Sequence, residues 1–182
     1  LIEVARARTE QGAGTLVGRV VAPNQVRIIR ISDETVPEWS DDLVVPPGVV
    51  GEITVVGPTA TERYFNRPDA DRIGKIRDGE RTVHRMGDLG YFDEGGLLWM
   101  CGRRSQRVEA EGGPICTEQV EPIFNTHPQV FRTALVGLGK KGAEEPVLIV
   151  ELEPGVGREQ QARITEELLL IAARHAHTRG IQ

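Results

Sequence analysis

Asp88 and Arg103 lie at the two ends of a segment that the sequence predicts to be one β-hairpin. A carboxylate accepts hydrogen bonds from two neighbouring hydroxyls, and a guanidinium donates to the same oxygens in a fixed planar geometry. Together these groups could hold a sugar diol such as a nucleoside ribose. Two plainer alternatives stay open: Asp88 could bond only its own turn, and Arg103 could be a surface charge at a strand end.

The elements that must position this pair are strands and turns. Tyr91-Phe92 and Leu97-Leu98-Trp99-Met100 flank a four-residue connection, 93–96, whose two glycines can adopt positive φ, which is a good hairpin signal. Further strands are predicted at 26–31 and 51–57, each bounded by turn residues. We therefore expect mainly β structure up to about Arg103.

Beyond Arg103 the pattern changes to a mixture of strands and helices. Pro122 is expected to make the first of these helices start late or bend, because a proline past the first turn removes a backbone hydrogen bond. The expected elements are a strand at 107–109, a loop at Gly112-Gly113-Pro114, a helix capped by Thr117, strands at 133–136 and 147–150, and a helix at 160–175. The sequence predicts an α+β fold with one part at 1–103 and another at 104–182.

Composition narrows the classes of partner and location. The formal net charge is −5, and no basic run is longer than Arg103-Arg104, which argues against a nucleic-acid or anionic-membrane surface. No window is apolar over transmembrane length. Cys101 and Cys116 are the only cysteines, and they form no zinc-ligand pattern. We expect reduced thiols, no metal site and a cytoplasmic protein.

The first residues contain neither an initiator methionine nor a leader sequence, so we expect the chain to be a piece of a longer protein.

Three sets of residues, in the right order, resemble the motifs of the adenylate-forming superfamily of acyl-CoA synthetases, peptide-synthetase adenylation domains and luciferases. Its GEI…G…Y…P, TGD(L)G and GR…G…E blocks are matched by Gly51-Glu52-Ile53 with Gly57-Pro58 and Tyr64-Phe65-Asn66-Arg67-Pro68, by Met86-Gly87-Asp88-Leu89-Gly90, and by Gly102-Arg103 with Gly112 and Glu121. The amino-acid sequence at 84–88, 99–103, 124–128 and 134–137 is most similar to that of one branch, the β-lactone synthetases of bacterial long-chain olefin biosynthesis. These enzymes are often labelled fatty-acid CoA ligases.

The resemblance implies that the β-rich first part closes a large adenylation domain and that the second part is a small α+β lid, incomplete at its C-terminus. Asp88 and Arg103 would bind the ribose hydroxyls of ATP or acyl-AMP. Ser105 would be the hinge, and Gly112 and Gly113 would form a lid loop. In CoA ligases that loop faces the pantetheine channel.

The sequence departs from the family pattern at three places. Met86 stands where the family usually has Thr, and Ser105 stands where many relatives have Asp or Lys. Gly113-Pro114 replaces the aromatic and basic residues that usually follow the loop glycine. The last change fits a reaction with an intramolecular nucleophile, since such a reaction needs no CoA channel.

The implied reaction uses magnesium ATP to adenylate the carboxylate of a long-chain β-hydroxy fatty acid, whose hydroxyl then displaces AMP to close a β-lactone. No Mg²⁺ ligand is identified in this chain, and other enzymes of a fatty-acid or olefin pathway would be its partners. One alternative is a fatty-acyl-CoA synthetase that uses CoA. Another is a non-catalytic nucleotide-binding or docking module.

Adenylation also requires positive charge at the α-phosphate, and the family supplies part of it from a lysine near the end of the lid. The only lysines here are Lys75, Lys140 and Lys141, and none lies near the end of the chain. We therefore assign no catalytic residue to this chain and expect the isolated chain to lack adenylation activity.

Overall fold

The computed structural model describes residues 2–181, which form two compact units. One unit is Leu16–Ser105, and the other combines the residues up to Thr15 with those from Gln106 onward. The sequence suggested a single boundary near Arg103, so the structure differs by grouping the N-terminal segment with the C-terminal unit. The assignment of 1–103 to a large domain and 104–182 to a lid stays a prediction, and its end residues 1 and 182 lie outside the described range.

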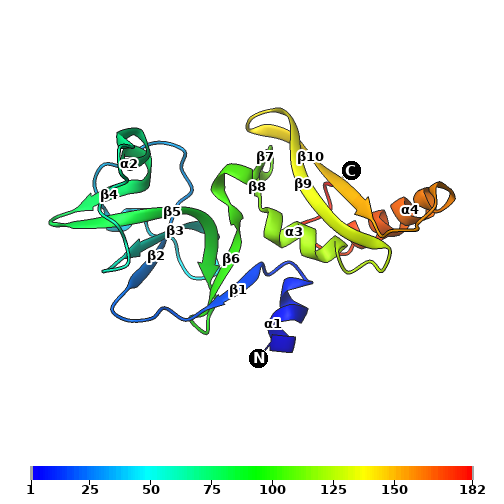
Figure 1. Ribbon diagram of the computed structural model, residues 1–182, viewed down its shortest axis with the longest axis horizontal. Coiled ribbons are helices and arrows are strands. Elements are labelled where there is room, and N and C mark those ends of the chain that lie inside the picture. The colour runs from blue at the N-terminus through cyan, green and yellow to red at the C-terminus, as the bar shows by residue number, and fades with distance from the viewer. Residues whose placement is uncertain (1, 182) are drawn as a thin grey trace. The chain divides into compact units, whose positions relative to one another are not determined.

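The unit Leu16–Ser105 is built on one curled sheet of six strands (Figure 1). Five strands lie in the order β1-β6-β5-β3-β2, and β4 pairs with β5 outside this path. The pairs β2–β3, β3–β5, β4–β5 and β5–β6 are antiparallel. The bounds are β1 Thr15–Gly18, β2 Gln25–Ile29, β3 Gly51–Val56, β4 Lys75–Asp78, β5 Arg81–Phe92 and β6 Leu98–Arg103.

Irregular pairing along β5 curls this sheet. The register shifts between Glu52 and Thr54 on β3 and between Leu89 and Gly90 on β5, and such bulges bend a strand and increase its twist. Gly90 lies where strands approach closely, because a Cβ there would be 2.3 Å from the carbonyl oxygen of Trp99. Only glycine fits this bend without moving the backbone.

The core of this unit consists of aliphatic side chains from the sheet and the segments that cover it. One cluster contains Ile29, Leu43, Val56, Ile76 and Val83, and another contains Ile28, Ile53 and Leu98. The short helix α2, Pro68–Gly74, has its proline in the first turn, where no backbone hydrogen bond is lost. A 3₁₀ turn, Asp41–Leu43, places Leu43 in the first cluster.

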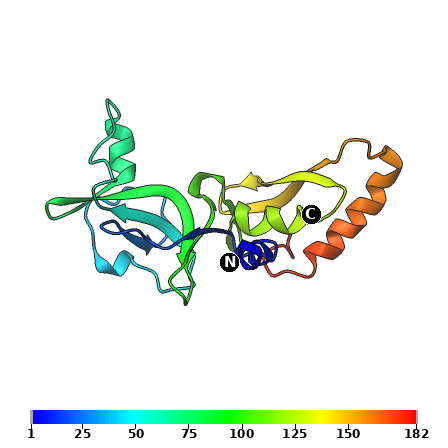
Figure 2. The ribbon, with the colours of Figure 1, turned by 60° about the horizontal axis from the view of Figure 1, so that its bottom comes forward.

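The other unit is an α+β arrangement around the long hairpin of β9 and β10, with α3 packed on β9 (Figure 2). Its core includes Val120 and Phe124 of α3, which lie one turn apart, and Ile164 and Leu168 of α4. The bounds are α1 Ile2–Thr9, β7 Val108–Ala110, β8 Gly113–Ile115, α3 Thr117–Phe124, β9 Val130–Lys140, β10 Ala143–Leu152, a 3₁₀ turn Arg158–Gln160 and α4 Gln161–Ala172. The α+β fold class is confirmed.

The helix α3 differs from its prediction at its start. Cys116 is the N-cap, with no side-chain cap hydrogen bond, so the expectation that Thr117 caps this helix is wrong. The helix also does not start late: it begins at Thr117, includes Pro122 and ends two residues later at Phe124. Pro122 has no backbone N–H to donate. Because it lies two residues before the end of the helix, the missing hydrogen bond affects only the last turn.

Candidate functional site

Asp88 on β5 and Arg103 on β6 are direct partners across the sheet. The Nη1 atom of Arg103 lies 3.0 Å from Oδ1 of Asp88. The Asp88 side chain is 17% exposed, whereas that of Arg103 is 58% exposed, so the pair lies at the surface with its acidic member partly covered. The structure thus brings together the two residues that the sequence singled out for a diol.

This geometry bears on the plainer alternatives for both residues. Asp88 lies inside strand β5 and pairs with a cation, so it is not simply bonding its own turn. Arg103 is a strand-end surface residue, as that alternative expects, but it is held by a carboxylate. A carboxylate beside a guanidinium can accept from two hydroxyls while the guanidinium donates to them.

A hollow of about 420 Å³ lies beside the same stretch of β5. Met86 and Gly87, which directly precede Asp88, form part of its wall, and the remaining lining is mostly polar or charged. The lining residues are Glu52, Tyr64, Arg67, Asp69, Ala70, Ile73, Gly74, Arg85, Met86, Gly87 and Arg104. The motif around Asp88 therefore borders a space open to a ligand.

One wall of the hollow is formed by Tyr64 and stabilised by His84. The two rings meet edge to face with centroids 5.9 Å apart, and His84 Nδ1 lies 3.1 Å from the carbonyl oxygen of Gly74. Burial, together with the nearby positive charge of Lys75, lowers the pKa of His84. His84 is therefore a neutral, half-buried strand residue at neutral pH.

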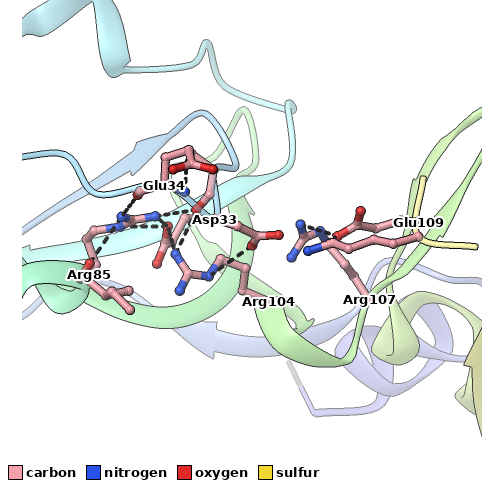
Figure 3. Close-up of polar contacts among 10 residues, drawn as sticks. Asp33, Glu34, Arg85, Arg104, Arg107 and Glu109 are labelled. Atoms are coloured by element: carbon pink, nitrogen blue, oxygen red, sulfur yellow. Dashed lines mark hydrogen bonds and ion pairs between the residues drawn. The ribbon is translucent and has the colours of Figure 1, made fainter. Parts of the chain in front are cut away.

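Beneath this surface lies a fully buried ion pair that the sequence analysis missed. The Nη2 atom of Arg85 lies 2.6 Å from Oε2 of Glu52, and the two side chains are 1% and 0% exposed. Arg85 also donates to the backbone carbonyls of Ser32, Glu34 and Ile73 (Figure 3). A glutamate in the mostly apolar strand 51–56 was the available signal, because charged residues are almost never fully buried without a partner.

The predicted hinge and lid-loop residues lie in short turns. Ser105 is exposed in the 3₁₀ turn Arg104–Gln106 and is the last residue of its unit. Gly112 lies at the tip of the β7–β8 hairpin, and Gly113, with φ +116°, pairs with Ala110. The stretch predicted as a loop is thus a hairpin whose second strand begins at Gly113.

The β7–β8 hairpin is held in place by charged contacts within its own unit. The amide of Glu109 donates to Oε2 of Glu144 at 2.7 Å, and the carboxylate of Glu109 lies 2.6 Å from Nη2 of Arg107. Lys141 Nζ lies 3.4 Å from that same carboxylate. Lys75, in the other unit, lies over the ring of Tyr64 at 4.8 Å. These contacts of Lys75 and Lys141 are each made within the lysine's own unit. The assignment of no catalytic residue to this chain stays a prediction.

Residues 2–181 contain neither a metal-binding cluster nor a membrane-spanning helix. Within this range no three His, Cys, Asp or Glu side chains are grouped so that they could hold a metal ion. Nor does any helix in that range combine the length and the apolar character needed to cross a membrane.

Comparison with known proteins finds relatives that are synthetases and ligases. No family model matches the chain. It is 57% identical to an olefin β-lactone synthetase of Xanthomonas campestris pv. campestris over 99% of its own length, and 55% identical to one of Stenotrophomonas maltophilia over 100%. It covers 33% of each of these relatives, so it spans about a third of their length.

Solved structures of other synthetases share the fold of this chain. The structure of O-succinylbenzoate coenzyme A synthetase from Bacillus subtilis in complex with AMP superposes with a TM-score of 0.65 and 25% identity, over 91% of this chain and 30% of that one. The same synthetase has also been solved with ATP and a magnesium ion. By sequence and by fold, the chain belongs to the adenylate-forming superfamily of ligases and corresponds to their C-terminal region.

Proposed function

We propose that this chain is part of an AMP-forming ligase that activates a long-chain β-hydroxy fatty acid and closes it to a β-lactone. The observation that carries the proposal is the Asp88–Arg103 pair, which lies at 3.0 Å within a chain 57% identical to an olefin β-lactone synthetase. The pair supplies the acceptor and the donor that a ribose diol needs.

In the proposed reaction the carboxylate of the fatty acid attacks the α-phosphorus of ATP, and pyrophosphate leaves. The β-hydroxyl then attacks the acyl carbon and loses its proton, and AMP leaves as the four-membered ring closes. Asp88 accepts hydrogen bonds from the ribose hydroxyls and Arg103 donates to the same oxygens. Their role is to hold the nucleotide in place while bonds change at its phosphate.

Magnesium is not assigned to residues of this chain. Asp88 is already paired with a cation, and among residues 2–181 no acidic cluster offers a magnesium site. Mg²⁺ prefers to stay bound to water and substrate phosphates with only one or two carboxylates. We therefore propose that the ion arrives bound to ATP.

The lid roles also belong to this proposal. Ser105 would be the hinge, and Gly112 and Gly113 would shape the lid surface. With no lysine after Lys141, positive charge for the α-phosphate would come from outside this sequence. The isolated chain is therefore expected to release no acyl-dependent pyrophosphate. Measurable release by the isolated chain would contradict this expectation.

Two observations support a cytoplasmic location and lactone closure without CoA. Cys101 and Cys116 are both buried thiols, which fits a reducing cytoplasm. Gly113-Pro114 at the start of β8 offers no aromatic or basic side chain to a pantetheine arm, which fits lactone closure without CoA. The acid would be delivered by enzymes of a fatty-acid or olefin pathway.

A fatty-acyl-CoA synthetase is the second candidate, because the synthetase from Bacillus subtilis with the same fold is named for coenzyme A. The complete protein that contains this chain separates the two. It is incubated with ATP, Mg²⁺ and a β-hydroxy fatty acid, with and without CoA. Lactone formed without CoA supports the proposal, whereas a CoA-dependent thioester and no lactone supports the second candidate. Pyrophosphate release in neither case would point to a non-catalytic module.

A further inference from the structure

Arg104, between the proposed ribose residue Arg103 and the proposed hinge Ser105, has a side chain directed into the unit. Its side chain is 16% exposed. Its Nη1 atom donates to the carbonyl oxygen of Ser32 at 2.8 Å and to Oε2 of Glu52 at 3.2 Å. Its Nε atom lies 3.9 Å from Oδ1 of Asp33, and Figure 3 shows Arg104 pointing toward Asp33.

The carboxylate that receives Arg104 is itself fixed. Glu52 lies in β3, an interior strand between β5 and β2, and its side chain is fully buried. Its Oε2 atom accepts from both Nε and Nη2 of Arg85, whereas Oε1 has no hydrogen-bond partner among the described residues. Arg85 and Arg104 therefore both bind Oε2 of Glu52, and Arg104 is bound to an atom that Arg85 already holds in place.

The two consecutive arginines are held by carboxylates in different settings. Arg103 is 58% exposed and pairs with Asp88 at the surface, whereas Arg104 is bonded to the buried Glu52. The next residue, Ser105, is the last of its unit. The strand end that carries Arg103 is thus tied down by the residue after it, directly before the chain passes into the other unit.

We propose that Arg104 is a positioning residue of the adenylation reaction. By tying the end of β6 to Glu52, it holds Arg103 at Asp88 for the nucleotide and makes Ser105 the first residue that is free to rotate. This inference rests on the proposed function. It assigns no contact with the nucleotide to Arg104, because that residue acts through Arg103.

Arg103 needs this support because an exposed arginine side chain is not held in one conformation by its own contacts. Arginine side chains carry several rotatable bonds, and an exposed ion pair such as Arg103–Asp88 is weak by itself. A charge-assisted hydrogen bond to a buried carboxylate is stronger and less screened. Small displacements of a group that positions a substrate have large effects on rate.

Arg104→Met is a suitable variant because both oxygens that accept its hydrogen bonds, Ser32 O and Glu52 Oε2, also accept from Arg85. Ser32 and Glu52 each keep a hydrogen bond from Arg85, and methionine keeps the apolar part of the side chain. In the complete enzyme we expect the KM for ATP in acyl-dependent ATP–pyrophosphate exchange to rise about tenfold. The midpoint of thermal unfolding should stay within a few degrees of the parent. An unchanged KM overturns the inference.

Two further variants serve as matched comparisons. Arg30→Met removes the same charge from an exposed ion pair with Asp42 in the same unit, and should leave the KM for ATP unchanged. Arg104→Lys keeps one strong donor but not the fork, so it should restore part of the lost affinity. If Arg104→Met does not fold, Arg104→Lys decides: a raised KM supports the inference, and an unchanged KM overturns it.

A double variant distinguishes positioning from a general structural effect. If Arg104 acts through Arg103, the KM for ATP of Arg103→Met/Arg104→Met should equal that of Arg103→Met alone. Independent contributions would instead multiply, and that result would overturn the inference.

The failure of the proposed function has a different signature. If the unmodified complete enzyme shows no acyl-dependent exchange, the proposed function fails. If that enzyme is active and Arg103→Met impairs it while Arg104→Met behaves like Arg30→Met, only the present inference fails.

Discussion

Arg85 and Glu52 form an ion pair that is closed off from solvent, with Nη2 2.6 Å from Oε2 and side-chain exposures of 1% and 0%. The two residues are 33 positions apart and lie on the neighbouring strands β5 and β3. Arg85 also bonds three backbone carbonyls, so the pair ties the loop at Ser32 and Glu34 to the sheet. The surface that carries Asp88 is built on this buried pair.

Removing Arg85 is therefore expected to be costly. Arg85→Met leaves the buried Glu52 carboxylate with Arg104 at 3.2 Å as its remaining cation. Breaking one side of a buried pair costs about 3–5 kcal/mol, whereas breaking an exposed pair costs about 0–1 kcal/mol. Urea denaturation should show this difference between Arg85→Met and the exposed-pair control Arg30→Met. Equal losses in the two variants would contradict a stabilising role for the buried pair.

Asp88→Ala is expected to weaken ATP binding by the complete enzyme. The variant removes the acceptor for two ribose hydroxyls, which costs on the order of 1–3 kcal/mol if these donors are left buried and unpaired. Isothermal titration with ATP measures the change, and Asp42→Ala, at an exposed carboxylate in the same unit, is the control. An unchanged affinity would limit Asp88 to its pairing with Arg103.

Gly90→Ala tests the close approach of strands at the bend of β5. A Cβ would lie 2.3 Å from the Trp99 carbonyl oxygen and 2.9 Å from Cδ1 of Ile53, so the backbone must shift. We expect a loss of unfolding free energy of about 1–3 kcal/mol, as for overpacking in a core. Gly112→Ala is the control because nothing lies within 4 Å of a Cβ there. A similar loss in both variants would count against the steric explanation.

Glu121 should give the second unit a pH-dependent stability. Its Oε1 accepts from the amide of Leu135 at 2.9 Å, and burial raises the pKa of this carboxyl above its ordinary value of 4.5. The neighbouring charge of Glu118 acts in the same direction, and the Leu135 hydrogen bond opposes it. The folded state therefore holds this proton more tightly than the unfolded state does, and its contribution to stability is lost as pH rises past 4.5.

Glu121→Gln keeps an acceptor for the Leu135 amide and removes the charge. Relative to the parent, the variant should gain stability as the pH is raised from about 4 to about 7, because only the parent must then bury a carboxylate. Urea denaturation across this range measures the difference. A difference that does not change with pH would rule out Glu121 as the titrating group.

Local sequence chemistry was sufficient for β2 and β3 and for the hairpin that carries the site. Asp93 accepts hydrogen bonds from the amides of Gly95 and Leu97, and Gly96 has φ +70°, so the turn is specified by its own four residues. That turn sets the pairing of Phe92 with Leu98, and the register shift between Leu89 and Gly90 then opposes Asp88 to Arg103. Motif order in the sequence was also enough to identify the superfamily.

Tertiary structure alone decided which distant groups meet. Glu52, Arg85 and Arg104 are far apart in the sequence, and no period of two or of 3.6 residues indicates that one carboxylate receives both guanidiniums. The N-terminal segment joins the unit from Gln106 onward because Gly12 fits against the carbonyl oxygen of Gln119, a contact that local propensity does not encode. Side-chain types and spacing determined the hairpin, whereas the bulge that brings its two charges face to face and the long-range packing that holds them in place were decided by the tertiary structure.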